Sequence, residues 1–110
     1  MSISLSTHVL NLDDGNPVAG MEIAIISAST EGVIAKSTTD ADGRIGDWGA
    51  DIVLNEGHYK LRFNTGDWFE KHNSSCFYPR VVIEFAATET RHYHVPLLVN
   101  RFGYSTYRGS

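Results

Sequence analysis

Polar and hydrophobic residues alternate through most of this chain, and clusters of Gly, Asp, Asn and Pro interrupt the alternation at short intervals. A period of two places successive side chains on opposite faces of a β-strand, and such clusters are typical of turns. The pattern therefore predicts an antiparallel all-β protein of about eight short strands. A length of 110 residues is enough for one hydrophobic core, so we expect a single domain over residues 1–110.

The alternation also predicts where the strands lie. The segment 21–27 is apolar on both faces and is expected at the centre of a sheet. Asp67 and Glu70 have the spacing of a helix N-cap and its third residue, so one short helix is expected at 67–73. The strands are expected at 3–11, 21–27, 33–38, 51–54, 58–63, 81–85 and 91–99, with a last one starting at Gly103.

Charge and hydropathy exclude several classes of partner. A net charge of -4 gives no basic field for a phosphate backbone, which argues against nucleic acid. No stretch approaches the roughly 20 apolar residues that span a bilayer, so no membrane partner is expected. The first eleven residues lack the basic and apolar regions of an export signal, which predicts a cytoplasmic protein. Cys76 is the single cysteine and is expected to be a small buried hydrophobe.

Three histidines fall on the polar sides of predicted strands. In 3–11 the alternation places His8 opposite the apolar residues, and in 91–99 it does the same for His92 and His94. Imidazole can exchange a proton near neutral pH, although a solvated face with scattered histidines has the same pattern. The outward faces carry Ser, Thr, Tyr and Pro with few Lys or Glu, which favours a face covered by another subunit.

Other polar residues could complete a site for hydrolysis. Arg44 follows the turn 40–43, where Gly43 is expected to supply a positive φ, and its guanidinium could hold an anion. Tyr107 could donate a hydrogen bond to an oxyanion. A solvent-facing turn arginine and a tyrosine packed on its neighbours are the plain alternatives. Ser110 is expected to place a terminal carboxylate beside Arg108, as a surface ion pair of little energy.

Two other hydrolytic chemistries are weaker alternatives. The pair His92 and His94 with a distant His8 has the composition of a three-histidine zinc site, but no carboxylate or thiol is placed to orient these ligands. A serine hydrolase lacks its usual G-x-S-x-G turn in this chain. Neither pattern is as consistent with the sequence as a metal-free acid-base site.

Four segments together resemble the 5-hydroxyisourate hydrolase family, the transthyretin-related enzymes of urate breakdown. They are LSTHVLN at 5–11, DADGR at 40–44, HYHVPLL at 92–98 and YSTYRGS at 104–110. The terminal YRGS is the specific element, because transthyretin itself lacks this tail and the two histidines. The resemblance runs nearly end to end, and it departs from the family pattern at Asn100 and Arg101 and at residues 76–79.

The resemblance implies a transthyretin-like, or prealbumin-like, β-sandwich of two four-stranded sheets with one short helix. It also implies a homotetramer with a central channel lined by the first, seventh and eighth strands. The implied reaction is hydrolysis of 5-hydroxyisourate to 2-oxo-4-hydroxy-4-carboxy-5-ureidoimidazoline, and it needs no cofactor and no metal.

Site residues follow from the same resemblance, position by position. A histidine, His8 or His94, is expected to activate water, while Arg44 and Tyr107 hold substrate oxygens and stabilise the oxyanion. Two rival functions stay open at this point: a transthyretin-like ligand-binding module without catalysis, and a zinc-dependent cyclic amide hydrolase. The catalytic set is His8, Arg44, His94 and Tyr107, and the substrate-binding set is His8, Arg44, Tyr107, His92 and Ser110.

Overall fold

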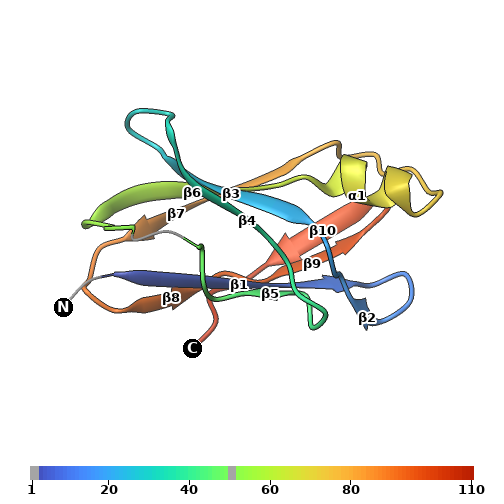
Figure 1. Cartoon of the computed structure of the whole chain (residues 1–110), viewed down its shortest axis with the longest axis horizontal. Helices are drawn as coiled ribbons and strands as arrows, with labels where there is room; N and C mark the ends of the chain where they lie inside the picture. Colours follow the sequence, from blue (N-terminus) through green and yellow to red (C-terminus); the bar gives the residue numbers. More distant parts are fainter. Residues whose placement is uncertain (1–2, 50–51) are drawn as a thin grey trace.

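Two β-sheets lie face to face, with one helix at the end of the sandwich (Figure 1). The structure is a computed structural model and describes residues 3–49 and 52–110. One sheet has four strands in the order β4-β3-β6-β7, and all its neighbours run antiparallel. Its strands are β3 (Glu22–Ser27), β4 (Val33–Thr38), β6 (Gly57–Phe63) and β7 (Val81–Ala87).

The other sheet is organised around the first strand, which pairs with four other segments. The predicted sandwich with one short helix is confirmed, and one sheet has the four strands expected. The second sheet has six, because short pieces of chain pair separately with β1. Its members are β1 (Ser4–Asn11), β2 (Asn16–Pro17), β5 (Arg44–Ile45), β8 (His92–His94), β9 (Leu97–Asn100) and β10 (Gly103–Thr106), and the helix is α1 (Thr65–Lys71).

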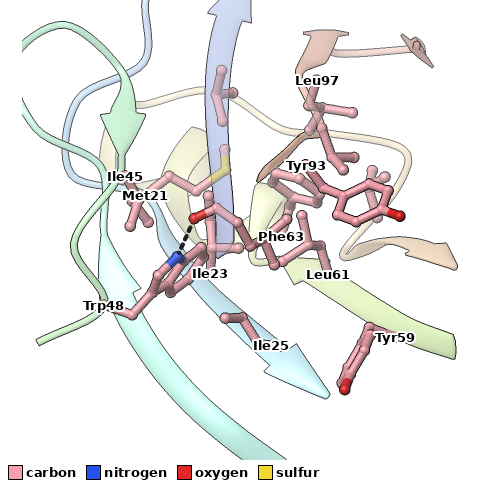
Figure 2. Packing of buried hydrophobic residues seen from close by; sticks show 14 of the residues in the cluster. Met21, Ile23, Ile25, Ile45, Trp48, Tyr59, Leu61, Phe63, Tyr93 and Leu97 are labelled. Atoms are coloured by element: carbon pink, nitrogen blue, oxygen red, sulfur yellow. Dashed lines mark hydrogen bonds between the residues drawn. The ribbon is translucent and has the colours of Figure 1, made fainter. Parts of the chain in front are cut away.

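The core lies between the two sheets, as Figure 2 shows. Ile23 of β3 and Phe63 of β6 are neighbours in register and are fully buried. Leu97 of the second sheet is also fully buried, and burying such a side chain contributes about 1.5–3 kcal/mol. The indole Nε1 of Trp48 donates to the backbone oxygen of Leu5 at 2.9 Å, which ties the segment after β5 to β1. The prediction that 21–27 is a central strand is confirmed.

The pairing of β1 with β8 and β9 differs from the prediction in two ways. It is parallel, so the expectation of a purely antiparallel domain is wrong at this position. The strand predicted at 91–99 is interrupted at Val95 and Pro96, since proline has no backbone N–H to donate. The hydroxyl of Thr7 donates to the backbone oxygen of Val95 at 2.7 Å, and that of Thr106 donates to Pro96 at 2.7 Å. The interruption is therefore stabilised from both neighbouring strands.

The helix starts earlier than predicted. Asn64 is the N-cap residue, and no side chain makes a capping hydrogen bond there, so the predicted capping box of Asp67 and Glu70 is wrong. Asp67 instead lies in the first turn, where its negative charge is favourable to the helix dipole. Tertiary hydrogen bonds hold the start of the helix. The hydroxyl of Thr65 donates to the backbone oxygen of Tyr78 at 2.6 Å, and the N–H of Gly66 donates to the backbone oxygen of Pro79 at 2.9 Å.

Three smaller expectations have mixed outcomes. Asp51, in the strand predicted at 51–54, lies outside the described residues, and Leu54 forms an isolated bridge with Ile3. Cys76 is half-buried rather than buried, with its thiol 3.8 Å from the backbone oxygen of Asn100. Within residues 3–49 and 52–110, the structure contains no helix long and apolar enough to cross a membrane.

Candidate active site

A row of serines and histidines lies on the outward side of the sheet, where β1 and β8 run side by side. The parallel register pairs Ser4 with His92 and Ser6 with His94. The Ser4 hydroxyl oxygen is 2.6 Å from Nδ1 of His92, and the Ser6 hydroxyl oxygen is 2.8 Å from Nε2 of the same ring. Ser6 is also 2.7 Å from Nδ1 of His94. The four side chains therefore form one continuous hydrogen-bonded chain, which we call the serine-histidine row.

Arg44 reaches the same face through the turn that precedes β5. His8 of β1 and Arg44 of β5 are antiparallel partners. Oδ1 of Asp40 accepts from the backbone N–H of Arg44 at 3.0 Å and closes the turn. Gly43 has the predicted positive φ, 77°, and a Cβ there would lie 2.5 Å from the backbone oxygen of Val9. The turn thus packs directly against β1 and places Arg44 across from His8.

The C-terminal segment packs against His94 of the row. The backbone N–H of Gly109 donates to the backbone oxygen of His94 at 2.8 Å. A Cβ on Gly109 would lie 2.5 Å from Cδ2 of the His94 ring, so a larger residue fits only if the ring or the tail shifts. Ser110 follows directly and is exposed. In Figure 1 the C-terminal end accordingly lies beside the sheet that contains β1 and β8.

The surroundings of His94 favour its neutral form. Partial burial lowers the pKa of His94 below its ordinary value of 6.5, and the positive charge of Arg44 lowers it further, with smaller contributions from His8 and His92. A neutral imidazole beside a guanidinium can accept a proton while the guanidinium holds an anion. The predicted histidines and Arg44 are therefore brought together by the fold.

Tyr107 has different surroundings from the serine-histidine row. Its side chain is 58% exposed and lines a cavity of about 330 Å³ together with Ile83, Tyr93 and Arg108. Tyr93 is buried on the face of β8 opposite the histidines. Within one subunit, the cavity that Tyr107 lines is thus on the other side of β8 from the row.

The geometry does not favour a zinc site. Among residues 3–49 and 52–110, no group of three or more His, Cys, Asp and Glu side chains is arranged to hold a metal ion. Both ring nitrogens of His92 already have serine partners, at 2.6 and 2.8 Å. The three-histidine alternative of the sequence analysis therefore lacks the ligand arrangement it requires.

Ser4 and Ser6 belong to the site although the sequence analysis did not select them. Its alternation pattern did place both on the same face of 3–11 as His8, which the structure confirms. What the sequence did not reveal is the parallel partner strand and its register. Without that register, nothing distinguishes these two serines from ordinary polar residues on an outward face.

The fold and these residues define a class of protein: transthyretin-like β-sandwiches with histidine, serine and arginine side chains gathered on the outer face of one sheet. A transthyretin structure from Sparus aurata superposes with a TM-score of 0.86 at 24% identity, covering 96% of each chain, which supports the fold. A family model described as the HIUase/Transthyretin family matches residues 5–109. The chain belongs to the HIUase/Transthyretin family.

Several relatives are similar over nearly the whole chain. A probable 5-hydroxyisourate hydrolase of Schizosaccharomyces pombe is 36% identical, over 97% of this chain and 91% of the relative. A probable 5-hydroxyisourate hydrolase of Caenorhabditis elegans is 40% identical, over 97% of this chain and 82% of the relative. The solved structure of Klebsiella pneumoniae 5-hydroxyisourate hydrolase superposes with a TM-score of 0.88 at 35% identity, covering all of both chains.

Proposed function

We propose that this protein hydrolyses 5-hydroxyisourate to 2-oxo-4-hydroxy-4-carboxy-5-ureidoimidazoline, a step of urate breakdown. Relatives that bear the name of this hydrolase match over almost the whole chain. The observation that carries the proposal is the position of His94, whose Nδ1 lies 2.7 Å from the Ser6 hydroxyl oxygen and whose pKa is lowered by partial burial and by the charge of Arg44. This arrangement supplies a base and an anion holder at one place.

The proposed reaction is attack of water on a ring carbonyl. Nε2 of His94, or alternatively the ring of His8, takes a proton from the attacking water. Arg44 holds the substrate oxygens and stabilises the negative charge that develops on the carbonyl oxygen. The ring C–N bond then breaks, and the departing nitrogen receives the proton. His92, which is linked to His94 through Ser6, and Ser110, which follows Gly109, support the site.

We also propose that the active unit is a homotetramer. The face that carries the row continues into Leu10 and Leu98, which are register partners and only partly buried in the single chain. Packing Leu10 and Leu98 against another subunit would remove them from water, while the row would line the channel between subunits, where Ser4 stays in contact with solvent. In such an assembly Tyr107 would donate to the oxyanion in a site shared between subunits.

We also propose that the protein is cytoplasmic. Cys76 is the single cysteine of the sequence, and its thiol is free. Proteins of reducing compartments do not depend on disulfides, and this fold is held by its core and its two sheets.

A ligand-binding module without catalysis is less consistent with the site. A sea bream transthyretin in complex with thyroxine has a TM-score of 0.86 to this chain at 25% identity. Binding sites for small molecules are mostly apolar, with few polar groups. The outward face of β1 and β8 instead carries two serines and two histidines that bond to one another.

The direct test is ultraviolet absorbance of freshly generated 5-hydroxyisourate with and without the purified protein. We expect decay clearly faster than the spontaneous rate, and the same rate after exhaustive chelation. Decay at the spontaneous rate would refute the hydrolase. Activity that is lost on chelation and regained with zinc would instead support the metal-dependent rival.

A further inference from the structure

The serine-histidine row has a property that none of its members has alone: its protons are linked. The hydroxyl oxygen of Ser6 lies within hydrogen-bonding distance of Nε2 of His92 and Nδ1 of His94, at 2.8 and 2.7 Å. A hydroxyl has one proton, so Ser6 can donate to only one of the two rings at a time. When both rings are neutral, the direction of that donation selects which of their nitrogens carry hydrogen.

In one direction, Ser6 donates to Nε2 of His92. The other nitrogen of that ring, Nδ1, then carries the hydrogen and donates to the hydroxyl oxygen of Ser4 at 2.6 Å. His94 donates its Nδ1 hydrogen to Ser6, which leaves Nε2 of His94 as a free acceptor. This state of the row has a base at its inner end.

In the other direction, every hydrogen bond is reversed. Ser4 donates to Nδ1 of His92, Nε2 of His92 donates to Ser6, and Ser6 donates to Nδ1 of His94. Nε2 of His94 now carries the hydrogen and is an acid. Both rings are neutral in both states, so the change creates no buried positive charge.

We propose that Ser4, Ser6 and His92 form a proton relay that switches Nε2 of His94 between base and acid during hydrolysis. Water gives a proton to Nε2 of His94, whose Nδ1 proton passes to Ser6. The Ser6 hydroxyl proton passes to Nε2 of His92, the Nδ1 proton of His92 passes to Ser4, and the Ser4 hydroxyl proton passes to solvent. One proton enters the row and one leaves it. The reversed row then gives its Nε2 proton to the departing nitrogen, and a proton from solvent resets the row through Ser4.

Exposure along the row agrees with this direction of transfer. Ser4 and His92 are exposed and can exchange protons with water, whereas Ser6 and His94 are partly buried. The charged and titratable groups that act on His94 are Arg44, His8 and His92, and all of them lower its pKa. A simple imidazolium is therefore disfavoured at this position, and a relay lets His94 accept a proton while staying neutral.

Ser6 is a positioning residue in this scheme, because it acts through His94. Ser6→Ala removes the shared hydroxyl, Ser6→Thr keeps it, and Ser37→Ala is the matched control. Ser37 is likewise a half-buried strand serine, in β4 of the other sheet. The catalytic part of the inference rests on the proposed function, whereas the linkage of the two rings can be measured without any substrate.

The experiment combines nitrogen NMR of isotope-labelled histidine with steady-state kinetics on 5-hydroxyisourate in light and heavy water. For Ser6→Ala we expect changed tautomer populations at both His92 and His94, kcat reduced about 10-fold or more with KM nearly unchanged, and a smaller solvent isotope effect. Ser6→Thr should restore the parental spectra and rate, and Ser37→Ala should change neither. Loss of activity in both Ser6 variants would contradict the relay, because then the hydroxyl is not what matters.

Unchanged tautomers and an unchanged kcat in Ser6→Ala would also overturn the relay. If the parental protein does not accelerate decay of 5-hydroxyisourate, the proposed function fails by itself. The NMR comparison then still decides whether the two rings are linked through Ser6. The two failures are therefore distinguishable.

Discussion

At the scale of single residues, three groups act on His94, the residue that we propose as the base. Ser6 contacts its Nδ1, Gly109 lies against its ring, and Arg44 lowers its pKa. Each acts by a different mechanism: hydrogen bonding, steric fit and charge. Each can therefore be tested with a different substitution.

The first residue-scale prediction concerns the pKa of His94. It should lie below 6.5, because burial and then the charge of Arg44 disfavour the imidazolium. As the pH falls below 6.5, the unfolded chain binds this proton first, so the protein loses stability until the lowered pKa is passed. Histidine titration by NMR should show a pKa that rises in Arg44→Gln and stays low in Arg44→Lys. A parental value at or above 6.5 would contradict this account.

The second residue-scale prediction concerns Gly109. A methyl group there would meet Cδ2 of His94 at 2.5 Å, so Gly109→Ala should displace the ring or the tail. We expect kcat/KM to fall by about 10-fold or more, because small misplacements of a catalytic group cost large factors in rate. Gly57→Ala is the control, since a Cβ at Gly57 meets nothing within 4 Å. Equal activity of the two variants would show that the tail does not position His94.

At the scale of elements, the site is built by short segments that converge on β1. β8 supplies His92 and His94, and β5 supplies Arg44. The turn before β5 has a defined role, because it brings Gly43 into contact with the backbone of β1. Strain in this turn should therefore affect both stability and the position of Arg44.

The element-scale prediction compares two glycines with the same φ of 77°, Gly43 and Gly15. Gly15→Ala should cost about 1–2 kcal/mol of unfolding free energy, the cost of a left-handed alanine. Gly43→Ala should cost at least about 1 kcal/mol more, because its Cβ would also meet the backbone of Val9 at 2.5 Å. Chemical denaturation measures both values. An equal loss of unfolding free energy in the two variants would mean that the turn can shift away from β1 and does not fix Arg44.

Much of this architecture could be predicted from the sequence, because alternation reports directly on which side chains are buried. The burial of Ile3, Leu5 and Val9 and the outward position of His8 follow from the pattern alone. Alternation does not report which strand is the neighbour or in which direction it runs. The parallel register of β1 and β8, and with it the roles of Ser4 and Ser6, therefore required the structure.

The start of α1 shows a second limit of the sequence. Asp67 and Glu70 have suitable spacing for a capping box, but Thr65 and Gly66 are bonded to Tyr78 and Pro79. These contacts join residues more than a helical turn apart in sequence, so a local rule does not include them. Tertiary hydrogen bonds thus decide where the helix begins.

At the scale of the whole molecule, the outward face of the six-stranded sheet should be an interface. Leu98→Arg adds a charge in the middle of that face and should dissociate the tetramer and reduce activity. Val33→Arg adds the same charge to β4 of the other sheet, where Val33 is exposed, and should leave the assembly intact. Sedimentation should give four times 12.2 kDa for the parent and for Val33→Arg. A parental protein that stays monomeric would contradict the interface.

If the outward imidazole of His94 performs the hydrolysis, removing it must lower kcat/KM for 5-hydroxyisourate, whereas removing an exposed histidine elsewhere must not. The comparison is between His94→Asn and His58→Asn, since His58 is an exposed histidine of β6 in the other sheet. We predict that His94→Asn lowers kcat/KM by about 10²-fold or more while His58→Asn leaves it unchanged. A His94→Asn protein that keeps its parental kcat/KM would show that His94 does not perform the hydrolysis.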